Sequence, residues 1–122
     1  MAGQGAVRMD LSGAAGMKVA IVAALWHEEY MDALLAGARA TCEQAGIRPS
    51  VMRVAGSFEL PVAALAQARR GAEAVIALGV VIRGDTPHFE YVSAAATDGL
   101  LRVSLDTGVP IGLGVLTCDT EE

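Results

Sequence analysis

Apolar residues along the chain gather in four short runs. The runs cover residues 17–25, 49–56, 72–82 and 109–117 and are rich in valine, isoleucine and alanine. Runs of this length and composition are typical of buried β-strands. The run at 72–82 is the longest, which predicts that it forms the central strand.

Three stretches between these runs carry apolar residues at helical spacing. The first, residues 27–46, has an apolar face made of Met31, Leu34, Leu35, Ala38, Cys42 and Ala45. The second, residues 57–71, begins with Ser57 as a candidate N-cap and has Pro61 in its first turn. The third, residues 87–108, has an apolar face made of Phe89, Val92, Ala96, Leu100 and Val103.

The alternating order of strands and helices predicts one α/β domain. This order favours a parallel sheet with helices on both of its faces. We expect residues 17–122 to form the domain, and the Gly- and Ala-rich residues 1–16 to be flexible or extended. The sequence ends at "CDTEE", where acidic residues commonly open another helix. We therefore expect closing C-terminal helices that this sequence does not contain, which leaves the domain incomplete.

Composition supports a packed aliphatic core and narrows the class of protein. Hydrophobic residues make up 53% of the chain but aromatic residues only 4%. The net charge of −5, with nine scattered Lys and Arg residues, argues against nucleic-acid binding. No apolar run is long enough to span a membrane, and the N-terminus lacks the layout of a signal peptide. We expect a cytoplasmic protein in which Cys42 and Cys118 are reduced thiols.

Residues suited to chemistry concentrate where the predicted strands end. Ligands of open parallel sheets bind beyond the carboxyl ends of the strands. Four segments meet that condition here: residues 25–27, 56–59, 83–88 and 116–122. The only tryptophan, one of the two phenylalanines and both histidines lie in or beside them. This concentration indicates a ligand site, although chance clustering of polar residues in loops is the alternative.

The loop at 83–88 has the features of a phosphate site. Thr86 can cap the third helix and Pro87 can occupy its first position, so free backbone N–H groups would face an anion. The same helix terminus disfavours a protonated imidazole, so His88 is suited to accept a proton near neutral pH. The alternative is a well-capped helix with a surface histidine. Arg83-Gly84-Asp85 joins a core strand to a helix, which argues against an adhesion motif.

Other residues at this edge also have two interpretations. Trp26 is followed by polar residues and can stack on a planar heterocycle, or it can be a core aromatic. Glu59 can accept hydrogen bonds from ligand hydroxyls, or it can simply stabilise a helix start. The backbone at the end of the central strand can bind the edge of a flat polar ring, through Val80, Val81 and Ile82. His27 is expected to be structural or exposed. Nucleotide-phosphate, dinucleotide, zinc and serine-hydrolase motifs are absent from the sequence.

Three segments of the sequence together resemble one enzyme family. They are "GSFELP" (56–61), "ALGVVIRGDTPHFEYV" (77–92) and "GVPIGLGVLTCDTEE" (108–122). They are similar to the 6,7-dimethyl-8-ribityllumazine synthases, and the resemblance spans residues 17–122. It implies a flavodoxin-like three-layer α/β/α fold with a four-stranded parallel sheet. It also implies a transferase that condenses 5-amino-6-(D-ribitylamino)uracil with 3,4-dihydroxy-2-butanone 4-phosphate, the penultimate step of riboflavin biosynthesis, without cofactor or metal.

The resemblance implies particular roles for residues of the first substrate's site. Trp26 would stack on the pyrimidine ring. The ribityl chain would be held by Ser57, Phe58 and Glu59. The pyrimidine edge would contact the backbone of Val80, Val81 and Ile82.

The resemblance also implies a phosphate site and an acid–base residue. The phosphate would be bound at Gly84, Asp85 and Thr86. His88 would transfer protons during imine formation, phosphate loss and ring closure. Members of the family continue beyond "DTEE" with an arginine that pairs with this phosphate, and that segment is not in this sequence.

Assembly into larger oligomers is a further implication of the resemblance. Family members form pentamers, decamers or shells of sixty subunits with active sites between subunits, and Leu113 would face the neighbouring subunit's site. Residues 6–11 could add a strand to a neighbour's sheet. The alternatives to the enzyme are a catalytically weak shell or scaffold protein and a flavodoxin-type module that binds a flavin or a purine.

Overall fold

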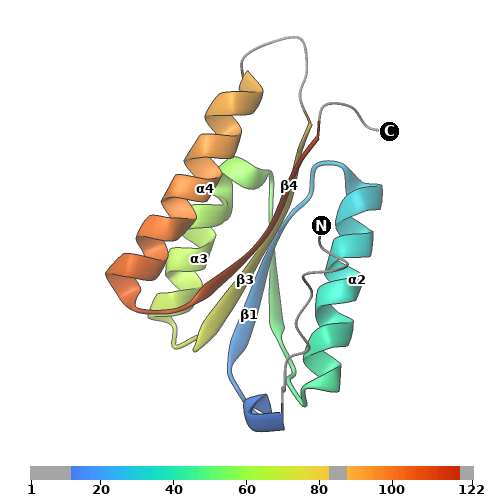
Figure 1. Ribbon diagram of the computed structural model, residues 1–122, viewed down its shortest axis with the longest axis vertical. Coiled ribbons are helices and arrows are strands. Elements are labelled where there is room, and N and C mark those ends of the chain that lie inside the picture. The colour runs from blue at the N-terminus through green and yellow to red at the C-terminus, as the bar shows by residue number, and fades with distance from the viewer. Residues whose placement is uncertain (1–11, 83–87, 119–122) are drawn as a thin grey trace, which may run out of the picture.

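A four-stranded parallel sheet forms the centre of the computed structural model, which describes residues 12–82 and 88–118, with side chains for 13–82 and 90–115 (Figure 1). The strand order is β2-β1-β3-β4. The strands are β1 (Val19–Ala24), β2 (Ser50–Val54), β3 (Ala74–Ile82) and β4 (Ile111–Cys118). Each coincides with one predicted apolar run. The predicted central position of the third run is confirmed, because β3 pairs with both β1 and β4.

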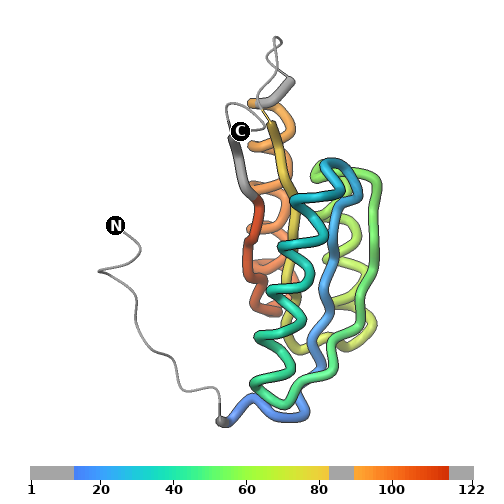
Figure 2. Tube along the Cα trace, turned by 90° about the vertical axis from the view of Figure 1, so that its right-hand side faces the viewer, coloured from blue at the N-terminus to red at the C-terminus, as the bar shows by residue number. Residues whose placement is uncertain are grey.

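Helices cover both faces of the sheet, which confirms the three-layer flavodoxin-like α/β fold. Helix α2 (Glu28–Gln44) lies on one face, and α3 (Leu60–Arg69) and α4 (His88–Thr107) lie on the other (Figures 1 and 2). Two short 3-10 helices, η1 (Ser12–Ala14) and η2 (Ser57–Glu59), complete the described elements. In the part of the chain that the structure describes, no helix is long and apolar enough to cross a membrane.

The core on the α2 side follows the predicted helical face. Met31 and Leu35 of α2 are buried against Ile21 and Ala23 of β1. All six residues of β1 are buried, as expected for a strand with neighbours on both edges and helices on both faces. Ile21, Val22 and Ala23 are completely inaccessible to solvent, so β1 anchors both halves of the core.

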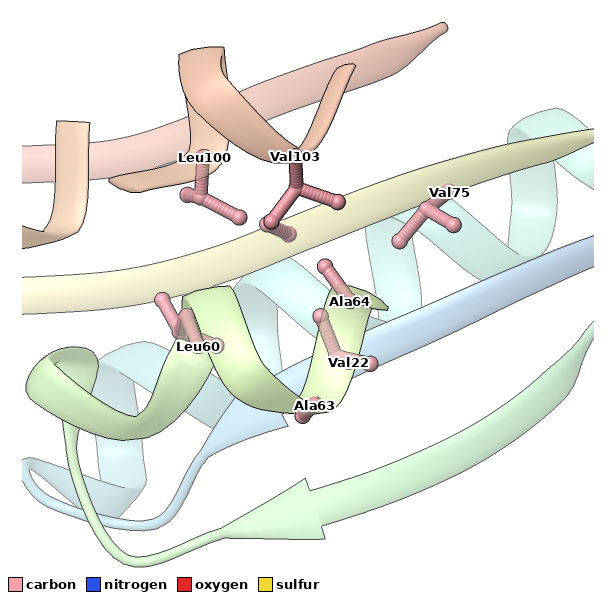
Figure 3. Close-up of a cluster of buried hydrophobic side chains, with 8 residues drawn as sticks. Val22, Leu60, Ala63, Ala64, Val75, Leu100 and Val103 are labelled. Atoms are coloured by element: carbon pink, nitrogen blue, oxygen red, sulfur yellow. The ribbon is translucent and has the colours of Figure 1, made fainter. Parts of the chain in front are cut away.

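The core on the other face joins both of the helices there to the sheet. Figure 3 shows Leu60 and Ala64 of α3 and Leu100 of α4 around Val22 and Val75 of the strands. Fully burying a leucine side chain contributes about 1.5–3 kcal/mol, so Leu60 and Leu100 are major contributors to stability.

Close contact between α3 and α4 depends on a glycine. A Cβ at Gly99 of α4 would lie only 2.6 Å from Pro61 Cγ of α3. Any side chain at that position would push the helices apart. Pro61 lies in the first turn of α3, which confirms its predicted place.

The predicted capping role of Ser57 is wrong. Ser57 opens η2, whereas α3 begins at Leu60 and has no side-chain hydrogen bond at its N-cap, Glu59. The 3-10 turn separates Ser57 from the free N–H groups of α3. Its side chain is buried beside β3 instead, with 6% of the residue exposed.

The N-terminal segment is described only from Ser12. Residues 12–14 form η1, and the backbone N–H of Gly16 donates to the carbonyl of Gly46 at 3.2 Å. Ala14 packs against a small cluster that contains Val19 and Ile47. The connection into β1 is therefore tied to the loop that follows α2.

Candidate active site

A cavity of about 550 Å³ opens at the carboxyl edge of the sheet. It is lined by Trp26, His27, Gly56, Ser57, Phe58, Glu59, Val80, Val81, Ile82 and Val92. Seven of the residues expected to bind the first substrate are therefore brought together. The cavity lies between β1 and β3, where the order β2-β1-β3-β4 reverses direction and where ligands of such sheets bind.

Trp26 lies in the turn between β1 and α2, at the mouth of the cavity. The backbone N–H of Leu25 donates to the carbonyl of Val54 at 2.8 Å, and that of Trp26 donates to the carbonyl of Ala55 at 3.3 Å. The residue is 67% exposed, so its ring is open to a partner. The alternative that Trp26 is a core aromatic is wrong.

The backbone at Gly56 lies directly beside the indole. A Cβ at Gly56 would lie 3.1 Å from Trp26 Cδ1 and 3.5 Å from Glu59 Oε2. The indole edge and the Glu59 carboxylate therefore flank the same point of the backbone. A flat aromatic surface and an exposed anionic acceptor are adjacent in the cavity.

His27 has a left-handed backbone conformation, with φ of 63° and ψ of 57°. It is the only residue other than glycine with positive φ among those that the structure describes. This conformation is unfavourable for a side chain with a Cβ and persists where surrounding contacts impose it. The sequence predicts that His27 is structural or exposed. In the structure, His27 is half-buried and lines the cavity.

Ser57 lines the cavity and packs against Gly79 of β3. Its Oγ is buried and has no hydrogen-bond partner among the described residues. A Cβ at Gly79 would overlap that oxygen and would lie 3.1 Å from Leu60 Cδ1. The glycine thus makes room for the buried Ser57 hydroxyl.

The end of β3 presents an unpaired backbone edge to the cavity. Pairing between β1 and β3 ends at Ala23 and Leu78, because the chain leaves the sheet after Ala24. On the opposite side, β3 continues to pair with β4 as far as Ile82. Along the β1-facing edge of residues 79–82, the backbone polar groups therefore have no strand partner among the residues that the structure describes. They are free to bind the edge of a planar ring.

The predicted phosphate site is only partly within the described residues. Gly84, Asp85 and Thr86 lie outside them. The backbone of His88 begins α4, which places the helix N-terminus at the same edge of the sheet as the cavity. Val92 of α4 and the exposed aromatic Phe58 also line the cavity, so α4 contributes to it directly.

Two other observations bear on the predicted site. Leu113 lies on the edge strand β4, is 54% exposed and does not line the cavity. A second hollow, of about 650 Å³, lies between α3 and α4 and contains none of the predicted site residues. We place the site at the carboxyl edge because the stacking ring, the carboxylate and the free backbone edge meet only there. No group of three potential metal ligands occurs among the described residues.

Sequence reasoning missed three residues of the cavity. The sequence assigns Gly56 no ligand role, places Val92 only on the apolar face of the third helix, and predicts that His27 is structural or exposed. The signal for Gly56 was its place directly after a strand and before Ser57. The conformation of His27 has no signature in the sequence, because it follows from the path between β1 and α2.

Comparison with known proteins gives a consistent result. The family model of 6,7-dimethyl-8-ribityllumazine synthase matches residues 16–122. A protein of that name from Leifsonia xyli subsp. xyli is 64% identical over 106 residues, covering 87% of this chain and 67% of its own length. Those from Streptomyces avermitilis and an Arthrobacter species are 54% and 58% identical, covering 100% of this chain and 76% and 79% of their own lengths.

Proposed function

Because the chain belongs to the 6,7-dimethyl-8-ribityllumazine synthase family, we propose that it condenses 5-amino-6-(D-ribitylamino)uracil with 3,4-dihydroxy-2-butanone 4-phosphate. The product is 6,7-dimethyl-8-ribityllumazine, formed in the penultimate step of riboflavin biosynthesis. This is a transferase reaction, and we propose that it needs neither cofactor nor metal.

The observation that carries this proposal is the composition of the carboxyl-edge cavity. A flat pyrimidine needs a stacking surface and donors or acceptors along its edge, and a ribityl chain needs acceptors for its hydroxyls. Trp26 supplies the stacking surface, and the free backbone edge of residues 79–82 supplies the donors and acceptors for the ring. Glu59 supplies the acceptor for the ribityl hydroxyls. The unpartnered Oγ of Ser57 is a further candidate for the ribityl chain.

The second substrate would bind beside this ring, toward the N-terminus of α4. The free N–H groups there favour a phosphate, and we assign its binding to Gly84, Asp85 and Thr86. His88 would transfer protons as the substrate amine adds to the ketone, as water and phosphate leave, and as the ring closes. Orientation of two reactants in one cavity supplies much of the rate enhancement for such reactions.

Assembly and location extend the proposal. The described surface carries exposed apolar side chains on α3 and α4, including Val62, which lines the hollow between these helices, and Leu105 of α4. Apolar patches of this kind are typical of surfaces that bind another protein. We propose a homo-oligomer built on pentamers, in which Leu113 faces a neighbouring subunit's site. We also propose one domain over residues 17–122 and a cytoplasmic location.

Mixing the two substrates with the protein tests the activity directly. Appearance of the lumazine absorbance at a rate proportional to enzyme concentration is the expected result. A full-length protein that binds a lumazine analogue but forms no product would favour the scaffold or ligand-binding alternatives.

A further inference from the structure

We propose that Arg53 is a positioning residue for Trp26, because its guanidinium holds the end of β1 from which the tryptophan turn departs. The proposal rests on the function above only in that Trp26 contacts the pyrimidine. Arg53 itself does not line the cavity. Its effect on substrate would pass through the backbone of residues 23–26.

Arg53 contacts two successive carbonyl groups at the end of β1. Its Nε donates to the carbonyl of Ala23 at 3.4 Å, and its Nη2 donates to the carbonyl of Ala24 at 3.2 Å. Both bonds are partly buried, and no ion pair of Arg53 is found among the described residues. The charged donor group is thus directed at the backbone. The charge on the donor strengthens these two bonds, although both are longer than the usual value of about 2.9–3.0 Å.

The last residue of β2 and the residue after it accept hydrogen bonds from the next two residues of the turn. The carbonyl of Val54 accepts from the N–H of Leu25, and that of Ala55 accepts from the N–H of Trp26. Residues 53–55 therefore bind four consecutive residues, 23–26. The first two of these accept through their carbonyls, and the last two donate through their backbone N–H groups. The tryptophan lies at the last of these contacts.

External contacts are needed here because the turn is not intrinsically favourable. The residue after Trp26 is His27, with φ of 63°, and it provides no side-chain hydrogen bond to cap α2. Trp26 is 67% exposed, so core packing does not fix its ring. A strained backbone persists only when its surroundings impose it, and the hydrogen bonds of Arg53 are part of those surroundings.

The two-carbonyl contact also explains why an arginine would be required. A guanidinium is planar and carries several donors in a fixed fork, so it can bind two acceptors at once. A lysine presents one compact charge on a flexible stem and would hold one carbonyl at a time. The competing interpretation is that Arg53 only places a charge on an edge strand, which discourages pairing with other chains. That role would leave Trp26 unaffected.

The test uses Arg53→Met and Arg53→Lys in the full chain. The matched control is Arg39→Met on the exposed side of α2, for which the described residues show no hydrogen bond or ion pair. Fluorescence anisotropy and acrylamide quenching report on Trp26 alone, since the sequence contains one tryptophan. Steady-state kinetics give KM for the pyrimidine substrate and kcat separately.

We expect Arg53→Met to raise KM for the pyrimidine roughly tenfold and to leave kcat within about twofold, as for loss of uniform binding. The anisotropy of Trp26 should fall, and its quenching by acrylamide should rise. Arg53→Lys should be intermediate, and Arg39→Met should match the wild type.

Wild-type values of KM and of Trp26 anisotropy in Arg53→Met would overturn the proposal, even if the melting temperature fell. If Arg53→Met does not fold, the same two readouts in Arg53→Lys decide, because unchanged values there overturn it equally. If the wild-type protein forms no lumazine, the proposed function fails, while the fluorescence of the variants still tests the positioning role.

Discussion

The indole of Trp26 lies against the backbone of Gly56, with only 3.1 Å between its Cδ1 and the position that a Cβ at Gly56 would take. Gly56 is extended, with φ of −149°, so alanine fits its backbone and the substitution tests the space alone. We expect Gly56→Ala to displace the exposed indole and to raise KM for the pyrimidine. Stacking of a base on an aromatic ring contributes about 1–3 kcal/mol, so the rise in KM should not exceed roughly 100-fold.

Gly37→Ala is the matched control for this substitution. Gly37 lies on α2, and a Cβ there meets nothing within 4 Å. The Gly37→Ala variant should have the same KM for the pyrimidine as the wild type. Equal KM values for Gly56→Ala and Gly37→Ala would contradict the placement of the pyrimidine beside Trp26.

Gly79→Ala is expected to destabilise the fold, because the new methyl group overlaps Ser57 Oγ in a packed region. Overpacking of this kind costs about 1–3 kcal/mol in the free energy of unfolding, measurable by urea denaturation. Adding Ser57→Ala should restore most of the loss, since it removes the overlapping oxygen and leaves Ser57 Cβ at an ordinary 3.4 Å. A double variant no more stable than Gly79→Ala would show that Leu60, 3.1 Å away, is the true obstacle.

Ser57→Ala alone separates stability from binding. The hydroxyl is buried without a partner among the described residues, so its removal should leave the free energy of unfolding unchanged or slightly raised. If the ribityl chain binds this oxygen, KM for the pyrimidine substrate should rise by roughly 5–10-fold, the value of one neutral hydrogen bond. An unaltered KM would exclude the side chain from the ribityl site.

His88→Ala is expected to retain substrate binding and to lose activity. A positioned general acid or base contributes roughly 10²–10⁴-fold to the rate, and the loss should appear in kcat. Quenching of Trp26 fluorescence by the pyrimidine substrate supplies the binding measurement. An unchanged kcat would remove His88 from the proposed proton transfers.

Burial raises the pKa of the Cys42 thiol above its usual range, because desolvation disfavours the thiolate. The stabilisation linked to this shift is complete below the pKa of the unfolded thiol, about 8.5, and is lost as pH rises through the folded value. In a Cys118→Ser background, we expect slow labelling of the native thiol and a fall in unfolding free energy above that pH. With Cys42→Ala added, the unfolding free energy should fall less over the same pH range. An equal fall with and without Cys42 would show that other groups cause it.

The sequence predicted the fold well because its two periodicities are clear. Apolar runs mark the strands, and the apolar face containing Met31 and Leu35 marks α2. The carboxyl-edge rule then placed Trp26, Ser57 and Glu59 in one region.

Four features of the site could not be read from the sequence, one for a local reason and three because they depend on neighbouring elements. The Ser57 cap failed because a 3-10 turn precedes α3, and a serine before an acidic residue does not distinguish the two geometries. The strain at His27 and the room at Gly79 arise from the path of neighbouring elements. Arg53 did carry a signal, as the one charged residue in the apolar run 49–56, but its partners follow from the register of β2 on β1.

The early departure of β1 from the sheet has a consequence for inhibitors of this protein. A compound that hydrogen-bonds to the free backbone edge of residues 79–82 would contact main-chain atoms that every residue except proline presents. Substitution of a side chain there leaves those atoms in place, while a proline or an altered backbone would disturb the pairing of β3 with β4. We would then expect resistance to such a compound to arise at Trp26 or its supports, where we propose that the pyrimidine substrate also binds.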